Sequence, residues 1–253
     1  MPGPVRVRKP QRLLIPAYFR ATNGLWHTTC DAVVQRRATA TLVMNPDSGP
    51  GAGTDENYRL AMDYCHARGQ TVVGYVTTDH ANRPVGDVTA DIDRWYQLYP
   101  GVRGVFLDEM SNHDDGDSRA YYSQLYRLVK QRSSQHQVVG NPGIAATTPW
   151  QVTTPVVDVL VVFEGPFQRR RPNDAATPYR DWRPPSWVAS RSAGFFAHIV
   201  YESPDPATTR AICVESWGNR NAGWIYVTPD GRPNPFDQIP DAALLSSPTL
   251  HRP

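Results

Sequence analysis

Arg103-Gly-Val-Phe-Leu-Asp108-Glu109-Met110 is a short apolar run that stops on two adjacent carboxylates. A run of this kind predicts a buried strand whose last residues emerge at the rim of a sheet. Carboxylates at that position do the chemistry of many α/β barrels and open α/β sheets. The plainer interpretation is that Asp108 caps the next helix and Glu109 is solvated. By itself the stretch supports both interpretations.

Apolar runs on either side of this stretch predict seven more strands, at 12–18, 41–45, 71–77, 137–141, 157–164, 194–201 and 222–228. Helices are expected at 26–37, 54–68 with Thr54 as N-cap, 87–98, 118–133, 206–217 and 241–245, whereas 147–154 offers little helix. Strands that alternate with helices indicate a parallel sheet, and about eight such units predict a single α/β domain, a (β/α)8 TIM-type barrel. We expect it to span 1–253, with 1–11 as an N-terminal tail and 229–253 as a C-terminal closing segment.

Composition excludes several classes of protein. The net charge of +2, mostly from scattered Arg, argues against a nucleic-acid partner. No apolar run approaches 20 residues, so we expect no membrane span, and the N-terminus has no apolar core of a signal peptide. As written the chain is expected to be cytoplasmic, or secreted if a signal was trimmed, and to be a monomer. Lys9 and Lys130 lie away from predicted strand ends, which argues against Schiff-base chemistry.

The cysteines and histidines point to no metal site. Cys30, Cys65 and Cys213 fall in predicted helices without a C-x-x-C pair, so we expect buried thiols and neither a disulfide framework nor a zinc site. His198 lies within a predicted strand, where a core histidine is expected, and the other histidines lie in loops or on surfaces. No metal and no cofactor are expected.

Polar and aromatic residues recur at the predicted carboxyl ends of the strands, which in a barrel converge on one mouth. They are Tyr18, Asn45, Asp47, Tyr75, Thr77, Asp108, Glu109, Asn141, Glu164, Tyr201, Tyr226 and Thr228. Further aromatics can stack on sugar faces, although any one of them can equally be packing: Trp26, Trp150, Trp182 and Trp224. The loop 49–53 is expected to be a turn rather than a phosphate loop, 112–117 an acidic rim, and 169–171 a solvated loop.

Asp108 and Glu164 are the pair that suggests a reaction. Their strands should lie roughly 9–10 Å apart, which lets inward-leaning carboxyls approach to about 5–6 Å, as in retaining glycosidases. Such an enzyme needs an ionised nucleophile and an acid whose pKa is raised by burial or by its neighbour. We therefore expect Asp108 to be the nucleophile or stabiliser, Glu164 the general acid/base, and Glu109 an acid that tunes one of them. Inversion of configuration remains open.

A set of short motifs follows in order along residues 12–228: LIPAY at 14–18, NPDSGPG at 45–51, GYVT at 74–77, DIDRWY at 91–96, GVFLDE at 104–109, NPG at 141–143 and FE at 163–164. Together they resemble the spherulin 4-like proteins. That resemblance implies a barrel and a glycoside hydrolase, since the family includes fungal endo-acting enzymes that degrade galactosaminogalactan, an α-1,4-linked polymer of galactose and N-acetylgalactosamine. It also implies that Asp108, Glu109 and Glu164 are the family's acids. Residues 169–171 and 184–185 match no family pattern, which leaves the sugar open.

The resulting hypothesis is an endo-acting glycoside hydrolase of an α-1,4-linked galactosamine/N-acetylgalactosamine polysaccharide. The expected substrate-binding residues are Tyr18, Asn45, Asp47, Tyr75, Asn141, Tyr201, Trp224 and Tyr226. An acidic mouth favours a partly de-N-acetylated, cationic polymer. Two alternatives remain: a barrel that binds glycan without cleaving it, and a lyase or isomerase that uses the same acids on a small molecule in a closed pocket.

Overall fold

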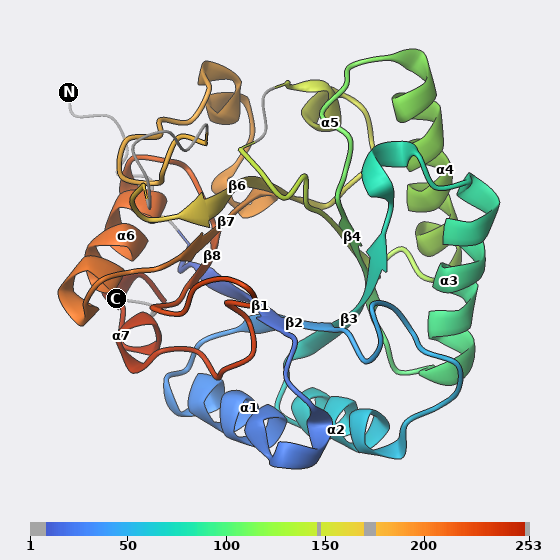
Figure 1. Ribbon diagram of the computed structural model, residues 1–253, viewed down its shortest axis with the longest axis horizontal. Coiled ribbons are helices and arrows are strands. Elements are labelled where there is room, and N and C mark those ends of the chain that lie inside the picture. The colour runs from blue at the N-terminus through green and yellow to red at the C-terminus, as the bar shows by residue number, and fades with distance from the viewer. Residues whose placement is uncertain (1–8, 146–147, 170–175, 251–253) are drawn as a thin grey trace.

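A computed structural model describes residues 9–145, 148–169 and 176–250, and its centre is a closed barrel of parallel strands (Figure 1). Neighbours in the barrel follow chain order from β1 round to β8, which pairs with β1. The strands are β1 (Arg12–Ala17), β2 (Ala40–Met44), β3 (Thr71–Thr77), β4 (Gly104–Asp108), β5 (Gln137–Gly140), β6 (Val159–Pro166), β7 (Phe196–Tyr201) and β8 (Trp224–Val227). The predicted (β/α)8 barrel is confirmed.

Helices form a ring outside the strands (Figure 1). They are α1 (Leu25–Gln35), α2 (Glu56–Ala67), α3 (Val85–Leu98), α4 (Gly116–Arg132), α5 (Trp150–Thr153), α6 (Pro206–Gly218) and α7 (Ala242–Leu245). The weak helical pattern at 147–154 yields only the four-residue α5. In the described part of the connection from β6 to β7, short 3-10 turns at Ser186–Ser190 and Ala193–Phe195 take the place of a helix. No helix within the described ranges is long and apolar enough to cross a bilayer.

The expected N-cap of α2 is wrong, and the structure rules out the interpretation of Asp108 as a helix cap. Helix α2 begins at Glu56, so Asp55 rather than Thr54 is its N-cap and accepts a hydrogen bond from the Asn57 N–H at 2.8 Å. The Thr54 hydroxyl donates instead to the Leu98 carbonyl at 3.1 Å. Helix α4 is capped by Asp115, whose side chain accepts from the Ser118 N–H. Asp108 therefore does not cap the helix that follows it and is available for another role.

The start of β4 explains the Arg103-Gly104 step that precedes the apolar run. Gly104 has φ 133°, and a Cβ there would lie 1.9 Å from the Gln137 carbonyl oxygen of β5. Only glycine lets the two backbones approach in this way. Val105, Phe106 and Leu107 are then buried, and Asp108 stands opposite Thr77 of β3 at the carboxyl end.

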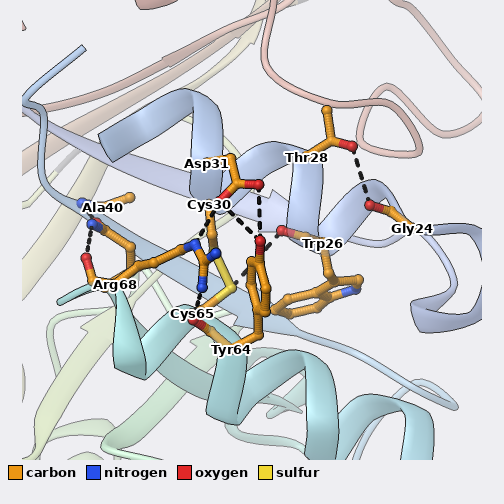
Figure 2. The surroundings of a disulfide bond; sticks show 10 residues. Gly24, Trp26, Thr28, Cys30, Asp31, Ala40, Tyr64, Cys65 and Arg68 are labelled. Carbon is orange, nitrogen blue, oxygen red and sulfur yellow. Dashed lines mark hydrogen bonds and ion pairs between the residues drawn. A yellow bond between two sulfur atoms is a disulfide. The ribbon is translucent and has the colours of Figure 1, made fainter. Parts of the chain in front are cut away.

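The expectation of three buried thiols is wrong for two of them, because Cys30 and Cys65 form a disulfide (Figure 2). Cys30 lies on α1 and Cys65 on α2, and the buried faces of these adjacent helices bring the two Cα atoms to 5.5 Å. The two cysteines are 35 residues apart and belong to no sequence motif, so their pairing becomes visible only from the packing of the two helices. Cys213 is a buried free thiol, as expected.

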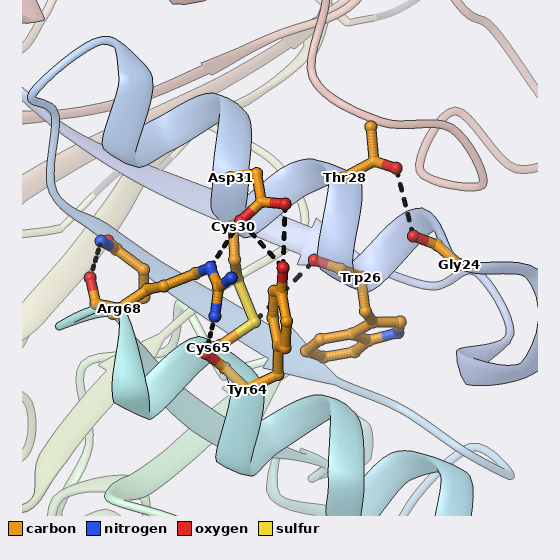
Figure 3. Close-up of polar contacts among 9 residues, drawn as sticks. Gly24, Trp26, Thr28, Cys30, Asp31, Tyr64, Cys65 and Arg68 are labelled. Carbon is orange, nitrogen blue, oxygen red and sulfur yellow. Dashed lines mark hydrogen bonds and ion pairs between the residues drawn. A yellow bond between two sulfur atoms is a disulfide. The ribbon is translucent and has the colours of Figure 1, made fainter.

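Polar contacts lie beside the disulfide (Figure 3). The Arg68 guanidinium pairs with Asp31, and the Tyr64 hydroxyl donates to the same carboxylate at 2.9 Å. Arg68 also lies 3.3 Å from the centre of the Tyr64 ring. Helices α1 and α2 are thus joined by a covalent bond and by an ion pair beside it.

Candidate active site

The carboxyl ends of five strands bring together the residues expected to react. Tyr18 follows β1, Tyr75 lies in β3, Asp108 ends β4, Asn141 follows β5, and Glu164 lies near the end of β6. In a parallel barrel these positions share one mouth. The contacts among their side chains show that they form one cluster.

Asn141 connects the two acids. Its Nδ2 donates hydrogen bonds to Asp108 Oδ1 at 2.8 Å and to Glu164 Oε2 at 2.6 Å. Because both oxygens bond to one nitrogen, they lie no more than about 5.4 Å apart. The Asn141 Oδ1 accepts the Gly143 N–H at 3.1 Å, which turns the amino side of the amide toward the acids. The acids are therefore held at a set distance by a nearly buried amide.

Asp108 accepts a second hydrogen bond, from the Tyr75 hydroxyl to Oδ2 at 2.8 Å. Burial raises the pKa of Asp108, and the hydrogen bonds from Tyr75, the Glu109 backbone N–H and Asn141 act in the opposite direction. The pKa of Tyr75 is itself raised by burial and by the charge on Asp108. The phenol therefore stays protonated and acts as a donor to a carboxylate.

Glu164 is an acid whose pKa lies near neutrality. Burial, followed by the negative charge of Asp108, raises its pKa to about 7, while the Asn141 hydrogen bond and the charge of Arg232 pull it down. Near neutral pH Glu164 therefore keeps its proton much more readily than an exposed glutamate does. Two neighbouring carboxyls of which one keeps its proton near pH 7 form the arrangement needed for acid catalysis beside an anion.

Tyr18 joins the cluster from β1. Its ring meets Tyr75 edge-on at 5.7 Å between centroids and Phe236 at 5.6 Å. Burial and the nearby charges of Asp108 and Glu164 raise its pKa, so it too is a neutral phenol at the mouth. Its backbone N–H donates to the Phe236 carbonyl at 3.1 Å, which ties the loop after β8 to the end of β1.

The loop after β8 supplies residues that sequence reasoning missed. Phe236 packs on Tyr18, and the exposed Arg232 lies close enough to Glu164 for its charge to lower the pKa of that acid. Nothing in the local sequence distinguishes these two from other loop residues. The one available clue was the rule that loops after barrel strands border the mouth.

The side chain of Glu109 points away from that of its neighbour Asp108. Its φ of 51° is left-handed, its side chain is exposed, and its Oε2 accepts a hydrogen bond from the Thr77 hydroxyl at 2.5 Å. Its side chain thus bonds to β3, while its negative charge still raises the pKa of Asp108, in line with the expected tuning role.

The remaining predicted binding residues have varied positions. Asn45 Oδ1 accepts the Gly49 N–H at 2.9 Å and shapes the loop after β2, on which Asp47 is exposed. Tyr201 ends β7 and is 7% exposed, and Tyr226 is fully buried in β8. Neither ring has an exposed face of useful size.

The tryptophans expected as sugar platforms are packing residues instead. Trp26 and Trp150 are fully buried, Trp182 is 6% exposed and Trp224 is 3% exposed. Trp224 begins β8, at the end of the barrel opposite to the mouth, where its ring lies under the Arg12 guanidinium at 3.7 Å. Trp224 is therefore far from the site, because the start of a strand lies at the rim opposite to the mouth.

Other polar groups are occupied by structural contacts. His198 is buried, and its Nδ1 lies 3.0 Å from both the Tyr179 and Ser216 hydroxyls, as expected of a core histidine. In the acidic stretch 112–117, Asp114 pairs with Arg119 and Asp115 caps α4. Of the run 169–171, residues 170 and 171 lie outside the described residues. Among the described residues no cluster of His, Cys, Asp and Glu could hold a metal ion.

The sequence model of the Spherulin4 family, spherulation-specific family 4, matches residues 12–244. This chain belongs to that family. Spherulin-4 of Physarum polycephalum is 32% identical over 224 residues, which make up 87% of this chain and 64% of that protein. The chain thus spans just under two thirds of the length of this relative. The resemblance inferred from the motifs is confirmed.

Solved structures with a similar fold include glycoside hydrolases. Aspergillus clavatus Sph3, solved in complex with GalNAc, superposes with a TM-score of 0.75 and 22% identity, covering 93% of this chain and 95% of that one. The chitinase RmChi1 of Rhizomucor miehei superposes with a TM-score of 0.54 and 11% identity, covering 94% and 99%. At these identities the likeness shows the barrel fold.

Proposed function

We propose that this protein is an endo-acting glycoside hydrolase that cleaves α-1,4-linked galactosamine/N-acetylgalactosamine polysaccharide with Asp108 and Glu164. The proposal rests on one observation: both carboxylates bond to the same Asn141 nitrogen, so their nearest oxygens are no more than about 5.4 Å apart. Carboxyl groups about 5–5.5 Å apart are typical of retaining glycosidases, whereas inverting enzymes need about 6.5–9.5 Å for a water molecule. Membership of the Spherulin4 family and the sugar bound to Sph3 support the choice of substrate.

The two acids divide the first chemical step between them. Asp108, with a donor on each oxygen, is the ionised nucleophile that forms a bond to the anomeric carbon. As the glycosidic C–O bond breaks, Glu164 gives its proton to the leaving oxygen. The product of this step is a glycosyl ester of Asp108 and a shortened chain with a free hydroxyl.

Charge coupling between the acids prepares the second step. The anion of Asp108 is one cause of the raised pKa of Glu164. Once Asp108 is esterified that charge is gone, the pKa of Glu164 falls, and Glu164 becomes the base that takes a proton from water. Water then attacks the anomeric carbon, the ester bond breaks, and Asp108 leaves as a carboxylate with overall retention.

The polar side chains around the pair are proposed to bind the sugar. Tyr18, Tyr75 and Asn141 contact or adjoin the acids, and Asn45 and Asp47 lie at the neighbouring strand end. The Tyr75 hydroxyl gives its hydrogen to Asp108, so its oxygen can accept a hydrogen bond from a sugar hydroxyl, and bonds of this kind orient the ring. Tyr226 is fully buried and packs against Phe236, which in turn packs against Tyr18.

New reducing ends released from the polymer test the proposal. Wild type should release them, and Asp108→Asn and Glu164→Gln should each lower kcat by about 10²–10⁴-fold while still binding oligosaccharide. Asp63→Asn, which changes an exposed carboxylate on α2, is the matched control and should be fully active. A wild-type protein that binds amino-sugar polymers and cleaves none of them would instead be a glycan-binding barrel.

A further inference from the structure

Four residues without the freedom of glycine have left-handed backbones at the adjoining ends of β3 and β4. They are Asp79, His80 and Ala81, with φ of 45°, 53° and 72°, and Glu109, with φ of 51°. Each such residue costs about 1 kcal/mol or more, so neighbouring contacts must hold it. Asp79, His80 and Ala81 lie in the loop after β3, next to the end of β4, and Glu109 directly follows Asp108.

The hydroxyl of Thr78 lies at the centre of these contacts. Its Oγ1 is 3.0 Å from the Asp108 carbonyl oxygen, 2.9 Å from the Glu109 carbonyl oxygen and 2.8 Å from the Tyr122 hydroxyl. The Thr78 backbone N–H also donates to the Asp108 carbonyl at 3.0 Å, and the His80 N–H donates to the Glu109 carbonyl at 2.7 Å. Both carbonyls that flank the left-handed turn are therefore satisfied from the β3 loop.

The direction of the hydrogen bonds follows from the chemistry of the groups. A carbonyl only accepts, so Thr78 must donate its single hydroxyl hydrogen to Asp108 or Glu109. Tyr122 must then donate to Thr78 Oγ1, and its own oxygen accepts the Ser111 N–H at 2.8 Å. The chain of donors runs from Ser111 through Tyr122 and Thr78 back to the carbonyls, and so closes around the turn 108–111.

The anchor of this chain is rigid. Thr78 and Tyr122 are fully buried, and the Tyr122 ring packs against Tyr121 and Trp150 at 5.0 and 5.8 Å between centroids. On the other side of the turn the Met110 N–H donates to the carbonyl of Asn141, the residue that bridges the two acids. The turn is thus fixed at both ends.

We propose that Thr78 and Tyr122 are positioning residues, which hold the left-handed turn at Glu109 and thereby fix the Asp108 carboxylate at the mouth. The inference rests on the proposed role of Asp108 in glycoside cleavage. It is supported by the Glu109 backbone N–H, whose hydrogen bond to the Asp108 carboxylate counters the effect of burial on its pKa. If the turn relaxes, that N–H rotates away and the anion of Asp108 loses a donor.

Removal of single hydroxyls tests the proposal. Tyr122→Phe and Thr78→Val each delete one oxygen from the chain, and Thr78→Ser restores the hydroxyl. The matched control is Tyr126→Phe, one turn along α4, where the hydroxyl donates to Asp158 at the opposite end of the barrel. The readouts are the pKa of Asp108, from carbon-13 NMR titration of its carboxyl with Asp108→Asn for assignment, and kcat and KM on the polymer.

Tyr122→Phe and Thr78→Val should raise the pKa of Asp108 by about half a pH unit or more and lower kcat about tenfold, with KM within about twofold. Thr78→Ser and Tyr126→Phe should keep the wild-type pKa and kcat. The proposal is overturned if Tyr122→Phe and Thr78→Val both leave the Asp108 pKa and kcat unchanged. The two hydroxyls would then affect only thermal stability, as the control Tyr126→Phe does. If Thr78→Val does not fold, Tyr122→Phe decides, because its ring stays packed. If wild type cleaves nothing, the proposed function fails, and the NMR titration still decides the positioning role.

Discussion

Asp108 and Glu164 accept hydrogen bonds from the same nitrogen, Asn141 Nδ2, at 2.8 and 2.6 Å. The carbonyl oxygen of that amide is occupied by the Gly143 N–H, so the amide cannot flip without losing a bond. One neutral side chain therefore sets the distance between the acids and reduces their mutual repulsion. A cation in the same place would also reduce the repulsion, but it would lower the pKa of Glu164 and so remove its proton.

Asn141→Ala removes the shared donor. The pKa of Glu164 should rise further above about 7, because the Asn141 hydrogen bond lowers it in the wild type. We expect the basic limb of the kcat/KM profile to move to higher pH and kcat to fall about 10²–10³-fold. Asn221→Ala is the control, since the Asn221 amide also donates twice, to the Val188 and Arg191 carbonyls, but precedes β8 at the far rim. Identical profiles for wild type and Asn141→Ala would contradict the bridging role.

Glu164 should make stability depend on pH. Its pKa in the folded protein, about 7, exceeds its ordinary value of 4.5, so the folded state holds the proton more tightly than the unfolded state. The stability from this group is present below about pH 4.5 and is lost as the pH rises to about 7. Glu164→Gln does not titrate, so it should raise the free energy of unfolding by about 3 kcal/mol at pH 8 and hardly at pH 4. Urea unfolding at both pH values measures this.

A suitable comparison for that experiment is Glu56→Gln. The hydrogen bond from Arg59 lowers the pKa of Glu56, so removal of this charge cannot produce a gain that grows with pH. A gain for Glu164→Gln that is the same at pH 4 and pH 8 would show that the raised pKa is not its cause.

Arg232 should set the position of the basic limb. Arg232→Gln removes a positive charge that lowers the pKa of Glu164, so the limb should move to higher pH. Because Arg232 is exposed, the move should be less than about one pH unit and should shrink with added salt. Arg36→Gln changes an exposed arginine at the opposite rim and should leave the profile in place. A basic limb that stays in place in Arg232→Gln at low salt would contradict the effect of this charge on the pKa of Glu164.

The disulfide should stabilise the fold by restricting the unfolded chain. For a loop of 35 residues, chain entropy predicts that Cys30→Ala with Cys65→Ala lowers the free energy of unfolding by about 3–4 kcal/mol. A reductant should destabilise wild type similarly and leave the double variant unchanged. Equal urea midpoints for oxidised and reduced wild type would exclude this contribution. The buried thiol of Cys213 is present in both proteins and does not affect the comparison.

The charge of the substrate should affect the rate. Exposed Asp47 and Glu109 lie on the loops beside the acids, so a partly de-N-acetylated, cationic polymer should be cleaved faster than a fully acetylated one at low salt. Glu109→Gln together with Asp47→Asn should reduce that preference, and salt should remove it. Equal rates on the two polymers at low salt would rule the preference out.

Much of the fold was predictable because its determinants are local. Apolar runs of four to eight residues, separated by helix-forming stretches and glycine or proline, indicated all the barrel strands. The carboxyl-end rule then placed Asp108, Asn141 and Glu164 at one mouth before any distance was known. The abrupt change from Leu107 to Asp108 predicted where β4 ends, whereas the left-handed backbone at Glu109 decides which of the two acids faces the site.

Contacts between distant segments were decided only by tertiary structure. The disulfide depends on α1 and α2 packing side by side, and the contact of Phe236 with Tyr18 depends on how the last loop folds back over β1. Trp224 is a different case, because its place at the start of β8 lies at the rim opposite to the mouth, as the strand predicted at 222–228 already implied. The sequence by itself determined which residues could react. Their protonation, spacing and support arise from burial and from hydrogen bonds between strand ends far apart in the chain, which no local pattern encodes.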